Sequence, residues 1–370
     1  MFFVGAFLGP SETKVRGGVQ FECLSLINSP ISSRVKWQLL DSTMQSLPPP
    51  PVYHRFFFAG RRLMLFLIRM GFQRPDCCLI YASSGGSFIE KGTMVLLARL
   101  FRVRVILRPV SGLIIDDYRA SVFFRMFTRA VLRSADVVAC QGARWREFFR
   151  AVGGLSAAQT PVVYNPVDAA TYAQIPLAGA KPAVKAILIG WVDRNKGIWD
   201  LLEVVRRFRA ELEGMQFIVC GKGGDFDDFA ATIHREGFDG FFELRGWVNL
   251  DEKLKALAEA EIFLMLSYRE GLPNALLEAM AAGRAVVATA VGAVPDMIRE
   301  RVTGMLCEPR DVDDIGRCIL QLRDDAGLRR RLADAARNRI TATVDYQVVW
   351  RQWADILLVN DTSGKSGGGS

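Results

Sequence analysis

The chain has 370 residues, which is too long for one ordinary domain and enough for two, each with its own core. Half of the residues are hydrophobic and 23% are charged, a balance that excludes a disordered protein. The formal net charge of +8 favours anionic partners such as nucleotides, phospholipid headgroups or nucleic acid, without choosing among them.

The apolar start, residues 1–8, lacks a basic leader and a small-residue cleavage site. We therefore expect a first strand, no signal peptide and a cytoplasmic chain. Arginines interrupt every apolar stretch before it reaches the roughly 18 residues of a membrane-spanning helix. The seven cysteines include no Cys-x-x-Cys pair and have no nearby histidine, so we expect no zinc site and reduced, buried thiols.

Short β-branched or aromatic runs alternate with helical periodicity, which is typical of parallel strands joined by helices. Strands are predicted at 2–7, 36–40, 78–82, 103–107, 136–139 and 162–164, with helices including 89–101 and 120–133. The pattern restarts with strands at 186–189, 216–220, 241–244, 262–266 and 285–289.

A small, proline-bearing stretch at 168–185 separates the two runs and predicts a linker. We expect an α/β fold with two Rossmann-like domains, at 1–172 and 181–344. A helix at 345–360 is predicted to pack back on the first domain, and the Gly/Ser-rich end, 361–370, is predicted to be a flexible tail.

The segment 267–283 carries the clearest signal for chemistry. It predicts a strand, a glycine turn and a helix that begins near Pro273, so the backbone amides from Gly271 through Leu272 to Ala275 point outward and attract phosphate. Two carboxylates, Glu270 and Glu278, bracket this anion site. They would repel a diphosphate, so we interpret them as acceptors for sugar or ribose hydroxyls; a solvated Glu beside a helix cap is the alternative, and geometry alone leaves both open.

Asn274 shares a helical face with Glu278. Glu270-x7-Glu278, with Gly-Leu-Pro-Asn after the first Glu and Ala-Met-Ala-Ala-Gly after the second, resembles the retaining GT-B glycosyltransferases of family 4, the glycosyl transferases group 1. Residues 285–295 and 304–309 extend the resemblance. It implies a GT-B fold with two domains facing across a cleft, in which Glu270 contacts the donor sugar and Glu278 contacts the ribose.

Residues 190–202 resemble a loop of the family in which a lysine that precedes a glycine binds the donor diphosphate. Lys196 occupies the position of that lysine. Trp191 stands where relatives usually carry an arginine. Arg194 is our hypothesis for the missing phosphate cation. An ordinary exposed lysine is the alternative for Lys196.

Three glycine segments resemble other parts of the family's donor site. Gly17 and Gly18 follow the first strand, in a loop expected to approach the donor phosphate. Gly221 and Gly246 belong to segments that resemble those beside the nucleotide base. Phe226 stands where a dinucleotide fingerprint needs glycine, so a dehydrogenase is not supported.

Two features of many transferases are missing from the sequence. No histidine follows the fourth N-terminal strand, where residues 108–112 read Arg-Pro-Val-Ser-Gly, and no Asp-x-Asp stands at a strand end. We therefore expect no metal and no cofactor, with Lys196, Arg194 and the helix amides neutralising the leaving diphosphate. Retention of configuration is implied by the family, and attack on the face of departure is favoured.

A basic, apolar segment at 54–74 carries five arginines and the run Phe56-Phe57-Phe58, and Arg125, Arg129 and Arg133 share one face of a second helix. Such helices lie well on an anionic membrane. Burial of the apolar face against the N-terminal sheet is the alternative. We expect a peripheral protein on the inner face of the plasma membrane, with a lipid-linked saccharide acceptor.

The sequence thus predicts a metal-independent hexosyltransferase that moves a sugar from a nucleotide diphosphate sugar to a membrane-proximal acceptor in polysaccharide or lipopolysaccharide assembly. A non-catalytic nucleotide-sugar binder, and a GT-B epimerase or inverting transferase, stay open as alternatives. Nucleic acid is not an expected partner, because basic and aromatic residues do not interleave in one strip.

Overall fold

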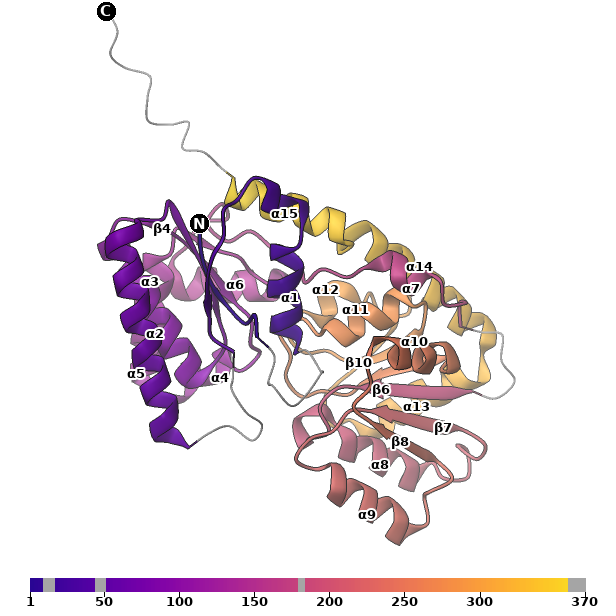
Figure 1. The fold of residues 1–370 in the computed structure, drawn as a ribbon. Helices are drawn as coiled ribbons and strands as arrows, with labels where there is room; N and C mark the ends of the chain where they lie inside the picture. Colours follow the sequence, from indigo (N-terminus) through magenta and orange to yellow (C-terminus); the bar gives the residue numbers. More distant parts are fainter. Residues whose placement is uncertain (9–16, 44–50, 179–183, 359–370) are drawn as a thin grey trace, which may run out of the picture.

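The computed structural model describes residues 1–8, 17–43, 51–178 and 184–358. Two all-parallel sheets, each flanked by helices, form an N-terminal and a C-terminal domain that lie side by side (Figure 1). The first sheet has the order β2-β1-β3-β4-β5 and the second the order β11-β10-β9-β6-β7-β8. The doubly wound α/β architecture predicted from the alternating pattern is therefore confirmed for both halves.

The strands of the N-terminal sheet are β1 (Phe2–Gly5), β2 (Gln38–Asp41), β3 (Cys77–Ala82), β4 (Arg104–Pro109) and β5 (Val137–Val138). Its helices are α1 (Gly18–Ile27), η1 (Pro30–Ser33), α2 (Val52–Gln73), α3 (Gly85–Leu100), α4 (Ile114–Ala120), α5 (Val122–Ser134) and α6 (Ala143–Gly153).

The C-terminal sheet has β6 (Lys185–Ile189), β7 (Gln216–Cys220), β8 (Phe242–Gly246), β9 (Ile262–Met265), β10 (Ala285–Thr289) and β11 (Met305–Cys307). Its helices are α7 (Ala169–Ala173), η2 (Arg194–Lys196), α8 (Ile198–Arg207), α9 (Phe226–Glu236), α10 (Leu250–Glu259), α11 (Asn274–Ala281), α12 (Val294–Met297), α13 (Val312–Asp324) and α14 (Ala326–Thr343), and α15 (Tyr346–Leu357) ends the described chain.

Two strand predictions differ from the structure. The stretch predicted at 162–164 makes only an isolated bridge, between Val162 and Cys140, because Pro161 and Pro166 on either side have no N–H to extend a ladder. The edge strand β11 is missing from the prediction. It is only three residues long, too short for a period-2 pattern to identify it.

The chain crosses between the domains twice, and the two crossings lie side by side. Val167 donates its backbone N–H to the carbonyl of Val344 at 3.0 Å, and Tyr346 donates to the carbonyl of Val167 at 3.1 Å. Helix α7 then packs against α11 and α14. The first crossing lies close to residue 172, the predicted end of the first domain, and the buried Tyr172 belongs to the hydrophobic core that the two domains share.

Helix α15 returns to the N-terminal domain (Figure 1). Trp353 is 1% exposed and stacks on Tyr81 with ring centroids 6.3 Å apart. The Arg108 guanidinium lies 5.6 Å from the centroid of the Trp353 ring, and Arg104 donates to the Ile356 carbonyl at 3.0 Å. One hydrophobic core consequently runs from the N-terminal sheet through the junction to α11 and α15, and a second lies under α8 and α13.

Candidate active site at the domain junction

Lys196 and Glu270 form the ion pair at the centre of the candidate site. The Nζ atom of Lys196 lies 2.6 Å from Oε1 of Glu270, and the two side chains are 27% and 12% exposed. β6 and β9 are neighbours in the parallel sheet, so the turns that follow them open on the same edge. Gly197, at φ 70°, allows this approach, because a Cβ there would collide with the backbone of Leu266.

The N-terminal domain reaches the backbone of Glu270. A Cβ on Gly112 would lie 2.7 Å from the carbonyl carbon of Glu270, so only glycine fits at this contact. The carbonyl of Gly271 accepts hydrogen bonds from the Trp145 indole at 3.4 Å and from the backbone of Ala293 at 2.8 Å. Glu270 is thus positioned by both domains.

Helix α11 begins beside this pair. Pro273 is its N-cap and offers no side-chain cap to the first-turn amides, as the sequence predicted. Leu272 is 4% exposed and Ala275 packs partly buried against the core. The free amides and the helix dipole make this end of α11 suited to an anion.

Asn274 links α11 to the N-terminal domain. Its Nδ2 donates to the carbonyl of Gly18 at 3.3 Å, and its Oδ1 accepts from Nδ2 of Asn165 at 2.8 Å. A Cβ on Gly18 would lie 3.2 Å from Nδ2 of Asn274, whereas Gly17 meets nothing within 4 Å. The predicted loop therefore meets the site at Gly18; residues 9–16 of that loop lie outside the described residues.

Glu278 is 9% exposed and is held within the protein. Its Oε1 lies 2.7 Å from Nζ of Lys253. Burial, then the charge of Glu278 and a hydrogen bond with it, hold the pKa of Tyr172 well above its usual range. Lys253 and Tyr172 were not predicted as partners of Glu278, because they come from helices far from the motif in the sequence.

The remaining predicted residues lie around the same sheet edge. Gly221 donates its N–H to the carbonyl of Gly246 at 2.6 Å, which joins the ends of β7 and β8. Trp191 is 42% exposed and meets Trp247 edge to face at 5.0 Å.

Arg194 is exposed at the start of η2. It lines an open hollow of about 530 Å³ with Asn195, Trp199, Tyr268 and Arg310. The structure therefore brings Lys196 to Glu270, while Arg194 lines the neighbouring hollow.

A buried polar network behind the site was not predicted. Arg108 is 0% exposed; its Nη2 lies 2.7 Å from Oε1 of Glu22 and donates to Oδ1 of Asn165 at 3.0 Å. Gln141 donates to the same Asn165 oxygen at 2.9 Å. No spacing in the sequence indicates that Asn165 would meet these partners.

Helices α2 and α5, which both pack against α3, carry many exposed apolar side chains. These are Val52, Tyr53, Phe56, Phe57, Met64, Leu67, Ile68 and Phe72 on α2 and Val122, Phe123 and Met126 on α5. Only two residues of the 22-residue α2 are buried. Neither helix contains an acidic residue. Within the described residues, no helix has both the length and the apolar character to cross a membrane.

The fold and the site define a GT-B architecture: two parallel-sheet domains with a lysine, a glutamate and a free helix end at their junction. The solved structure of Anabaena Alr3699/HepE in complex with UDP and glucose superposes with a TM-score of 0.73, at 16% identity, covering 97% of this chain and 99% of that one. This likeness confirms the GT-B fold.

Residues 183–325, most of the C-terminal domain, match the family model described as Glycosyl transferases group 1. The chain is 26% identical over 231 residues to a glycogen synthase of Mycobacterium tuberculosis strain H37Rv, covering 62% of this chain and 55% of the relative. It is 27% identical over 163 residues to the lipopolysaccharide core biosynthesis glycosyltransferase LpsE of Rhizobium meliloti, covering 44% and 46%. The chain spans about half the length of both relatives.

Proposed function

We propose that this protein is a retaining glycosyltransferase that moves a hexosyl group from a nucleotide diphosphate sugar to a saccharide acceptor. The observation that carries the proposal is the 2.6 Å pair of Lys196 and Glu270 at the uncapped start of α11. Lys196 supplies a cation for the diphosphate, the α11 amides supply hydrogen-bond donors, and Glu270 accepts from sugar hydroxyls. The relatives named above act in saccharide synthesis, which supports the reaction class.

The proposed transfer needs no metal or cofactor. As the glycosidic bond to the diphosphate breaks, negative charge grows on the leaving oxygen, and preorganised donors lower the energy of that charge. Lys196 and the α11 amides face it, and Arg194 is proposed as a second cation that moves in from the neighbouring hollow. Glu270 is already paired with Lys196, so it is suited to holding the sugar and not to attacking it. We therefore favour attack by the acceptor on the face from which the diphosphate departs.

We further propose that the acceptor is lipid-linked and that the protein works on the inner face of the plasma membrane. Phe56 and Phe72 are 75% and 88% exposed, far more than a helix buried against its own sheet requires. Arg55 and Arg61 stand exposed on the same helix, and no acidic residue of α2 opposes an anionic headgroup. The relative in lipopolysaccharide core biosynthesis supports an acceptor of this class.

The donor is tested by thermal unfolding with UDP-, GDP-, ADP- and TDP-sugars, on the wild type and on Glu278→Ala. A donor that binds the folded state raises the melting temperature. We expect one nucleotide class to stabilise the wild type and not the variant. Transfer is then tested by release of the nucleoside diphosphate and by acceptor glycosylation with that donor; binding without release with every acceptor would favour a nucleotide-sugar binder. No stabilisation by any donor would overturn the proposal.

The membrane part is tested by flotation with phosphatidylglycerol and phosphatidylcholine vesicles. We expect the wild type to float with the anionic vesicles. The double variant Phe56→Ser/Phe57→Ser should remain in the unbound fraction. Val302→Ser, at an exposed apolar residue of the C-terminal domain, is the matched control and should float. A wild type that binds neither vesicle would indicate a soluble acceptor.

A further inference from the structure

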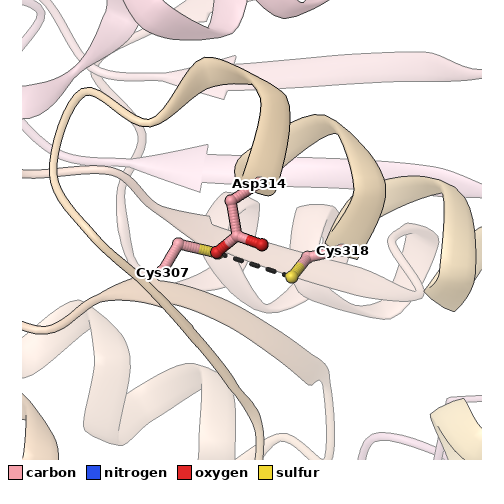
Figure 2. Close-up of side chains that lie close together, drawn as sticks. All are labelled: Cys307, Asp314 and Cys318. Carbon is pink, nitrogen blue, oxygen red and sulfur yellow. Dashed lines mark hydrogen bonds between the residues drawn. The ribbon is translucent and has the colours of Figure 1, made fainter.

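Two cysteines and one aspartate outside the candidate active-site pair converge at the edge of the C-terminal sheet (Figure 2). Cys307 ends β11, and Asp314 and Cys318 lie four residues apart on α13, hence on one helical face. The two sulfurs are 3.5 Å apart, and the three ligand atoms all lie within 4.8 Å of one another. Cys307 and Cys318 are 2% and 7% exposed.

We propose that Cys307, Cys318 and Asp314 bind a zinc-class metal ion. Two Zn–S bonds of about 2.3 Å at the tetrahedral angle hold their sulfurs about 3.8 Å apart, close to the separation seen here. A disulfide needs about 2.05 Å between its sulfurs, so these two sulfurs are more than about 1 Å too far apart to be bonded in this arrangement. In the metal-free protein the Cys307 thiol is hydrogen-bonded with Cys318 and with the Asp314 carboxylate, so the three ligand atoms already face one another.

The charges around the cluster suit a metal with this donor set. Two thiolates and one carboxylate exceed the charge of a divalent ion by one, and arginines stand close by. Nη2 of Arg317 lies 3.3 Å from Oδ1 of Asp314, and the charge of Arg301 acts on Cys318 against that of Glu300. The Asp314 side chain is 35% exposed, which gives an ion and a completing water access to an otherwise buried site.

The other five cysteines do not gather in this way. All seven are free and buried, and within the described part of the chain this is the one cluster of three or more His, Cys, Asp or Glu ligands with such spacing. A bound ion would join the short edge strand β11 to α13 across residues 308–311. Arg310 in that segment lies 4.6 Å over the ring of Tyr268, two residues before Glu270. The proposed ion therefore has a structural role, and its binding does not depend on the transferase proposal.

The test uses Co²⁺ as a spectroscopic probe on the reduced, metal-free full chain. We expect one equivalent to bind with thiolate-to-cobalt charge-transfer absorption and Zn²⁺ to displace it. Cys318→Ala should abolish the absorption without leaving a buried hydroxyl, and Asp314→Asn should weaken Co²⁺ binding about tenfold or more. Cys220→Ala, at a buried cysteine outside the cluster, is the matched control and should bind like the wild type.

A second measurement covers variants that fold poorly. Zn²⁺ should raise the melting temperature of the wild type and of Cys220→Ala, but not that of Cys307→Ala. Absence of thiolate-to-cobalt absorption in the wild type would overturn the proposal. So would its persistence in Cys318→Ala, and so would air oxidation of the pair to a disulfide with no metal uptake by the reduced protein.

Discussion

Asn165 of the N-terminal domain donates through Nδ2 to Oδ1 of Asn274 at 2.8 Å, the first residue of α11 in the C-terminal domain. The same amide donates to the carbonyl of Leu272 at 2.8 Å. Its Oδ1 accepts from Arg108 and Gln141, so both ends of the side chain are satisfied. The helix end proposed to receive the diphosphate is therefore oriented by a residue from the other domain.

We expect Asn165→Ala to lower the free energy of unfolding by about 1–3 kcal/mol, because it leaves buried donors of Arg108 and Gln141 without this acceptor. Urea unfolding of the variant and wild type measures the difference. Asn338→Ala removes an exposed amide from α14 and should change stability little. Equal stabilities of Asn165→Ala and Asn338→Ala would contradict the role given to the network.

Removing the cation of the central pair should weaken donor binding. We expect Lys196→Ala to raise the Kd of the stabilising nucleotide sugar about 10- to 100-fold, since it removes a charge-assisted contact to the diphosphate. Calorimetric titration gives the Kd, and Lys255→Ala, an exposed lysine on α10, is the control.

Arg194→Ala should weaken the same binding by a smaller factor if its guanidinium leaves the hollow for the diphosphate. Comparing titrations with the nucleoside diphosphate and the free nucleoside isolates the phosphate contribution, because only the first ligand carries the charge. An unchanged affinity for the diphosphate would remove Arg194 from the site.

Substitutions of Glu270 and Glu278 should affect different quantities, the first the rate of transfer and the second the binding of the nucleotide. Glu270→Gln should lower kcat by about 100-fold or more and leave nucleoside diphosphate binding nearly intact, because its proposed partner is the donor sugar. Glu278→Gln should weaken binding of the nucleoside diphosphate itself. Since Glu278 also holds Lys253, the variant Lys253→Ala is needed as a control for disturbance of α11. Equal effects of both glutamine variants on product binding would argue against distinct roles.

The ion pair between Arg62 on α2 and Glu90 on α3 predicts that the stability of the protein depends on pH. Glu90 is 8% exposed and accepts from Arg62 at 2.5 Å and from Lys91 at 3.0 Å. Burial raises the pKa of Glu90, but these two cations outweigh it, and the pKa is lowered. A lowered carboxyl pKa stabilises the fold above the unfolded value of about 4.3, and this contribution is lost as the pH falls through the folded pKa.

Glu90→Gln should therefore cost about 3 kcal/mol near pH 7, and the difference from wild type should shrink below about pH 4. Urea unfolding at both pH values measures it. Glu213→Gln, at an exposed position, should show no such dependence. A difference that stays constant with pH would assign the loss to packing and not to the charge of Glu90.

The resemblance to a known family assigned Lys196 and Glu270 to one site, and the structure gives the physical reason why they meet. Lys196 and Glu270 each follow an apolar strand, and adjacent parallel strands place such turns on one edge. The partners of Glu278 could not be found in this way, because Lys253 and Tyr172 arrive by helix packing. Cys307 and Cys318 are eleven residues apart, and only the fold of β11 against α13 brings their sulfurs together.

The paired crossings at Val167 and Val344–Tyr346 restrict how the domains can move. A single covalent connection would let one domain swivel freely about the chain. Here two crossing segments of the chain run side by side and are joined by two backbone hydrogen bonds. Twisting one segment against the other would break those bonds, whereas bending both segments together would keep them. We therefore expect any opening that admits a donor to Lys196 to bend both crossings together, so that the two domains rotate about a line through this junction.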